Sequence, residues 1–97
     1  MSIETANALR AAKARIDTPE KWCKGANMDG ERLCAWWTVR GFAQHINFRV
    51  YNQVVRALHS QLPKGVSVPA YNDLPTTTHA DIMALYDRAI ADEESAP

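Results

Sequence analysis

Three segments of this chain carry apolar side chains at the three- and four-residue spacing with which an α-helix buries one face. The stripes consist of Ile3, Ala6, Leu9, Ala12 and Ile16, then of Phe48, Tyr51, Val54, Val55, Leu58 and Leu62, and finally of Ile82, Leu85, Tyr86, Ala89 and Ile90. An amphipathic helix gains most of its stability by packing its apolar face against other elements. The spacing therefore predicts an all-α fold.

The ends of two of these helices carry sequence signals. Thr78 precedes Asp81 by three residues, which approximates a capping box at the start of the last helix. Asn47 is a suitable cap for the middle helix, and the Pro-Lys-Gly run at 63–65 predicts its end, because proline removes a backbone donor and glycine accommodates a left-handed exit.

The segments between these helices have other patterns. Pro19 follows a cap-type threonine and predicts a short helix that carries Trp22 and Cys23. Residues 33–39 are almost entirely apolar, which fits a central helix or a buried strand, since so short a run does not reveal its period. Residues 66–71 alternate and contain a proline, which indicates an edge strand or an extended connector.

The length of 97 residues fits one domain. We predict a single all-α bundle of about four helices over residues 1–91, with a short extended connector near 66–71 and an aromatic-rich core. Acidic side chains oppose the helix dipole at a C-terminus, so we expect residues 92–97 to form a frayed acidic tail.

The composition, with 46% hydrophobic and 23% charged residues, is that of a globular protein. No segment approaches the roughly 20 apolar residues that span a bilayer, and the N-terminus lacks the apolar centre of a secretion signal. We therefore expect a cytoplasmic protein without membrane contact. In that compartment Cys23 and Cys34 are expected to remain thiols.

Charge is unevenly distributed although the formal net charge is zero. Residues 31–64 carry five basic and one acidic side chain, and residues 65–97 carry one basic and six acidic side chains. Such asymmetry either orients a partner or is neutralised within the fold. We favour neutralisation, because a nucleic-acid-binding domain usually keeps a net positive charge.

Three short motifs resemble those of a family of small uncharacterised proteins of bacteria and their phages, a domain of unknown function. They are Trp22-Cys23-Lys24-Gly25, Leu33-Cys34-Ala35 and Asn72-Asp73. The resemblance covers roughly residues 9–90. The resemblance implies a helical architecture, and it implies no particular biochemical activity.

Catalytic candidates are weak. Cys34, His79 and Asp73 together suggest a cysteine-dependent hydrolase, but the apolar neighbours of Cys34 predict a buried, inert thiol. Turn chemistry accounts for Asp73. The spacing of Cys23, Cys34 and His45 matches none of the paired ligands of zinc sites, so we predict no metal and no cofactor.

Aromatic and basic side chains of the central region are the candidate partner-binding residues, because tryptophan and arginine are common anchors of protein interfaces. They are Trp36, Trp37, Arg40, Arg49 and Arg56. We predict a non-enzymatic protein-interaction module, such as a phage or bacterial accessory factor that binds a host protein. Alternatives are nucleic-acid binding through the basic central helix and the cysteine-dependent hydrolase. A homodimer is compatible with each.

Overall fold

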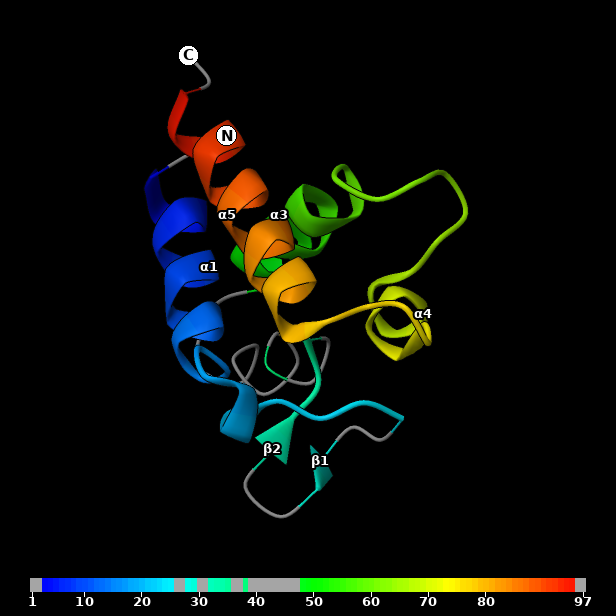
Figure 1. The fold of residues 1–97 in the computed structure, drawn as a ribbon. Coiled ribbons are helices and arrows are strands. Elements are labelled where there is room, and N and C mark those ends of the chain that lie inside the picture. Colours follow the sequence, from blue (N-terminus) through cyan, green and yellow to red (C-terminus); the bar gives the residue numbers. More distant parts are fainter. Residues whose placement is uncertain (1–2, 26–27, 30–31, 36–37, 39–47, 96–97) are drawn as a thin grey trace.

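The computed structural model describes residues 3–25, 28–29, 32–35, 38 and 48–95. These ranges contain four α-helices, which are α1 (Ile3–Ala14), α3 (Phe48–His59), α4 (Val68–Asp73) and α5 (His79–Ser95). A 3₁₀ turn, η1 (Pro19–Lys21), precedes two short strands, β1 (Met28–Asp29) and β2 (Arg32–Leu33), that pair antiparallel with Met28 opposite Leu33. The all-α prediction is confirmed (Figure 1).

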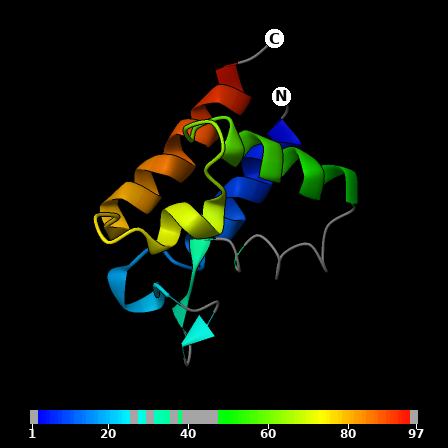
Figure 2. The same ribbon diagram turned by 90° about the vertical axis from the view of Figure 1, so that its right-hand side faces the viewer.

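Helices α1, α3 and α5 each pack against the other two. Figures 1 and 2 show α1 and α5 running antiparallel, with the start of α1 and the end of α5 at one end of the molecule and β1 and β2 at the other. None of the described helices is long and apolar enough to cross a membrane.

The core is built from the predicted stripes. Ala6, Leu9, Ala12, Ile16, Val54, Leu58, Ile82, Leu85, Tyr86, Ala89 and Ile90 are all buried. Ile3 is 60% exposed, contrary to prediction, because it lies in the first turn of α1 at the end of the bundle.

The described part of this core is mainly aliphatic rather than aromatic-rich. Tyr86 is fully buried, whereas Trp22 is half-buried at the core's edge, and Trp36 and Trp37 lie outside the described residues. The Tyr86 hydroxyl lies 3.0 Å from the Ala35 carbonyl oxygen and 2.8 Å from the Thr38 hydroxyl oxygen. Burial raises the pKa of Tyr86 well above its ordinary value.

The extended connector predicted near 66–71 is wrong, because Val68–Asp73 forms helix α4. Ser67 begins this helix as its N-cap, with its hydroxyl accepting a hydrogen bond from Ala70 N at 3.2 Å, and Pro69 suits the first turn. The alternation of 66–71 was too short to outweigh a cap followed by a proline.

The prediction of a short helix that carries Trp22 and Cys23 is also wrong. Only Pro19–Lys21 forms a 3₁₀ turn, and Trp22 is extended and pairs with Leu33 in an isolated parallel bridge. The 33–39 segment was predicted to be either a helix or a buried strand. Its described residues include both, because strand β2 ends at Leu33 while Ala35 and Thr38 are helical.

The acidic end of the chain is helical rather than frayed as far as Ser95, four residues beyond the predicted boundary. Two of its acidic side chains contact side chains of other segments. Asp92 accepts a hydrogen bond from Gln61, Glu94 forms an ion pair with Arg10, and Glu93 is buried. These contacts offset the unfavourable interaction of acids with the helix dipole. Ala96 and Pro97 lie outside the described residues.

Opposite charges of distant segments meet on the surface. Lys13 of α1 pairs with Asp87 of α5 at 2.7 Å, and Arg49 of α3 pairs with Glu4 of α1 at 3.1 Å. Part of the acidic C-terminal charge is thus neutralised by α1 rather than by the basic middle of the chain.

Candidate binding site

The three sequence motifs converge on Asn72, which is fully buried in α4. Its Oδ1 accepts hydrogen bonds from Trp22 Nε1 at 2.7 Å and from Ala35 N at 3.0 Å. Its Nδ2 donates to Cys23 O at 3.1 Å. An asparagine amide supplies both acceptor and donor, so this one side chain ties together the segments around residues 22, 35 and 72.

The neighbouring motif residues also serve the architecture. Asp73 Oδ1 accepts a hydrogen bond from Gly25 N at 2.8 Å, where Gly25 has a φ of 80° that favours glycine. Lys24 Nζ donates to Leu74 O at 2.7 Å and to Thr77 O at 2.6 Å. These hydrogen bonds therefore attach the segment that connects α1 with the β1–β2 hairpin to α4 and to the loop that follows it.

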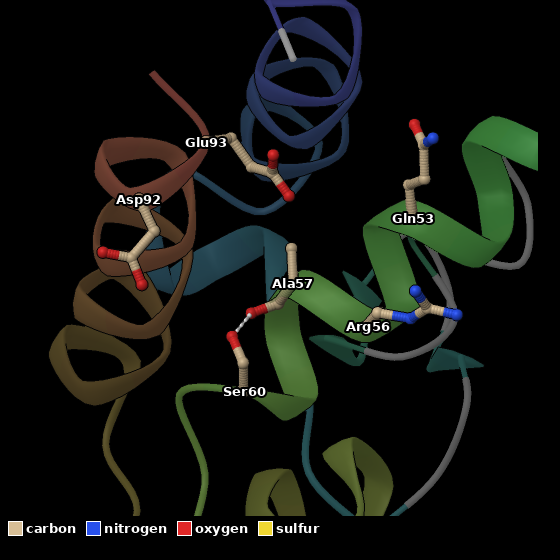
Figure 3. Close-up of a pocket in the computed structure, with 6 residues that line it drawn as sticks. All are labelled: Gln53, Arg56, Ala57, Ser60, Asp92 and Glu93. Carbon is tan, nitrogen blue, oxygen red and sulfur yellow. Dashed lines mark hydrogen bonds between the residues drawn. The ribbon is translucent and has the colours of Figure 1, made fainter. Parts of the chain in front are cut away.

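A pocket of about 450 Å³ lies between α3 and α5, and we call it the α3–α5 pocket. Its lining consists of Gln53, Arg56, Ala57, Ser60, Asp92 and Glu93 (Figure 3). Helix α3 supplies the first three of these residues, Ser60 directly follows α3, and α5 supplies the two acidic residues. In Figure 3 the Glu93 side chain points from α5 toward α3.

The pocket walls carry charges of both signs. Glu93 is only 8% exposed, Asp92 lies beside it, and Arg56 stands exposed on the α3 wall. Two polar neighbours are fixed by other contacts. Gln53 Oε1 accepts from Thr5 Oγ1 at 2.7 Å, and Ser60 Oγ donates to Ala57 O at 2.8 Å. The wall is therefore organised before anything binds.

A family model described as a family of unknown function, DUF6197, matches residues 1–92. The chain belongs to the DUF6197 family. No curated protein and no solved structure matches it. The resemblance inferred from the motifs is confirmed at the level of a family of unknown function. In this DUF6197 member, Asn72 connects the three motif segments.

The structure shows the surroundings of each catalytic candidate. Cys34 is 3% exposed, in agreement with the burial predicted for it. His79 Nε2 donates to Ile16 O at 2.7 Å, and its ring lies 5.9 Å from the Trp22 ring, centroid to centroid. Asp73 is occupied by Gly25 N and by Asn72 Nδ2. His79 and Asp73 are thus oriented by other partners.

The described residues contain no group of three or more His, Cys, Asp or Glu side chains that could hold a metal ion. His45 lies outside these residues.

Of the predicted partner-binding residues, Trp36, Trp37 and Arg40 lie outside the described residues. Arg49 is exposed and paired with Glu4, and Arg56 lines the α3–α5 pocket. The other pocket residues were not predicted.

A signal for Glu93 was nevertheless present in the sequence. Glu93 lies three residues after Ile90 and four after Ala89, so it continues the buried face of α5.

Proposed function

We propose that this DUF6197 member is a non-enzymatic protein-interaction module, such as a phage or bacterial accessory factor that binds a host protein. The α3–α5 pocket receives a basic side chain, Lys or Arg, from the partner. One observation carries the proposal, which is that the largely buried carboxylate of Glu93 lines an accessible pocket beside Asp92.

Charge complementarity favours this occupant. A cation that enters the pocket meets two carboxylates in surroundings partly shielded from water, where charge-assisted hydrogen bonds are worth about 1.5–3 kcal/mol. Arg56 on the opposite wall pairs with an acidic residue or a carbonyl next to the partner's basic side chain. The pocket thus suits a peptide segment with both groups.

The same geometry disfavours nucleic acid as the partner. Asp92 and Glu93 line the pocket that contains Arg56, and two carboxylates repel a phosphate. Arg49, seven residues earlier on α3, is engaged with Glu4. The basic helix predicted to bind phosphates therefore presents its arginines beside acidic side chains.

The test is selection of binding peptides from a displayed random library on the immobilised full chain. We expect enrichment of peptides that contain Lys or Arg. The dissociation constant of a selected peptide should rise by about tenfold or more in Glu93→Gln, since loss of about 1.4 kcal/mol corresponds to tenfold. Glu20→Gln is the matched control, because Glu20 is exposed on η1, outside the pocket.

A second pair of variants tests the other wall. Arg56→Ala is expected to weaken peptide binding, whereas Arg88→Ala, which removes an exposed arginine of α5 that does not line the pocket, is expected to leave it unchanged. Peptides without basic residues, or equal affinity for wild type and Glu93→Gln, would contradict the proposal.

A further inference from the structure

Each of the two cysteines directly follows one partner of an isolated backbone bridge. Trp22 and Leu33 pair in a parallel bridge, and Cys23 N donates to Leu33 O at 3.1 Å. The residues that follow a parallel pair are themselves neighbours, and their side chains point to the same face. These residues are Cys23 and Cys34.

The spacing of this pairing suits a disulfide. The bridge joins Trp22 and Leu33, and paired strands lie about 4.8 Å apart, within the roughly 4.4–6.8 Å between Cα atoms that a disulfide spans. We infer a similar separation for the cysteines, which are the next residues on both sides. Asn72 holds the arrangement on both sides, because its side chain bonds to Cys23 O and to the N–H of Ala35, the residue after Cys34. Both sulfurs are thiols in this structure.

Both cysteines are largely buried, with Cys23 6% exposed, and they differ in that only Cys23 lines a pocket. Cys23 lines a second pocket, of about 360 Å³, together with Pro19, Trp22, Lys24, Arg32 and His79. Cys34 is 3% exposed and does not line that pocket. A small oxidant in the pocket therefore meets Cys23 first.

We propose that Cys23 and Cys34 form an oxidative modification site, at which hydrogen peroxide drives formation of an intramolecular disulfide. The Cys23 thiolate attacks one peroxide oxygen, which breaks the O–O bond, gives the sulfenic acid and releases water after proton transfer. The Cys34 thiol then attacks the sulfenic sulfur, forms the S–S bond and displaces a second water. The two thiols lose two electrons and the peroxide gains them. This site is independent of the α3–α5 pocket.

The test uses the native full chain treated with hydrogen peroxide, denatured in the presence of a maleimide, and analysed by intact mass and peptide mapping. We expect loss of both maleimide-reactive thiols together and a linked peptide joining Cys23 to Cys34, at a rate that does not depend on protein concentration. Linkage only between chains, or oxidation of the native chain without the linked peptide, would overturn the proposal.

Two variants test the order of the steps. In Cys34→Ser the sulfenic acid at Cys23 should accumulate and react with dimedone, whereas wild type should give little adduct. In Cys23→Ser the oxidation of Cys34 should be slower than that of Cys23 in Cys34→Ser. If either variant fails to fold, the test is wild type oxidised in the native state and wild type oxidised in denaturant. A linked peptide that forms only in denaturant would contradict the proposal, because the folded chain would then not bring the two cysteines together.

Discussion

Replacing Asn72 with alanine removes the side chain on which the three motifs converge, and the structure allows the cost to be worked out. Ala35 N and Cys23 O lose buried hydrogen bonds to the amide, and each such loss costs about 1–3 kcal/mol. Trp22 is half-buried, so a water molecule can replace much of the hydrogen bond that its Nε1 loses. We expect Asn72→Ala to lower the free energy of unfolding by about 3–5 kcal/mol.

The measurement is urea denaturation followed by tryptophan fluorescence and by far-ultraviolet circular dichroism. Asn52→Ala is the matched control, because Asn52 is exposed on α3, and its effect should stay within about 0.5 kcal/mol. A loss below about 1 kcal/mol for Asn72→Ala would refute the reasoning, since that is less than the cost of one lost buried hydrogen bond.

Three further predictions concern stability. The pKa of Tyr86 is raised in the folded state, so the stability that the neutral hydroxyl contributes is complete below the unfolded pKa of about 10 and is lost as the pH rises above that value. Above pH 10 the unfolding free energy of wild type should therefore fall by up to about 1.4 kcal/mol per pH unit relative to Tyr86→Phe. Gly25→Ala meets no atom within 4 Å, so thermal unfolding should report only the backbone cost of its φ of 80°, about 1–2 kcal/mol. Thr78→Ala removes the acceptor for Asp81 N and should lower stability by about 0.5–2 kcal/mol in the same assay. An unchanged stability would contradict a role of the capping box.

The features predicted correctly from sequence are those set by short-range chemistry. The capping box at α5 forms in both directions, with Thr78 N donating to Asp81 Oδ2 at 2.9 Å and Asp81 N donating to Thr78 Oγ1 at 3.2 Å. The apolar stripe of α5 is buried throughout because its period matches the helix.

The features that escaped prediction depend on contacts between distant segments. Trp22 follows a proline that favours a helix, but its pairing with Leu33 keeps it extended. Helix α5 continues past Ala91 because Asp92 and Glu94 contact side chains of other segments. Neither partner can be identified from local sequence.

The candidate site was missed for the same reason. Arg56 was predicted as a binding residue on its own helix, but the carboxylates across the pocket come from α5, more than thirty residues later in the chain. Glu93 was assigned to an acidic tail because of its charge, although its position continues the buried face of α5.

Titration of the isotope-labelled full chain with a selected Lys- or Arg-containing peptide, followed by amide chemical shifts, tests the proposed binding mode most directly. We predict that the largest shifts fall on α3 and on the C-terminal half of α5, around Arg56 and Glu93, and that they shrink at equal peptide concentration in Glu93→Gln. Shifts centred on the β1–β2 hairpin and on the pocket lined by Trp22 and Cys23, unchanged by Glu93→Gln, would contradict the account.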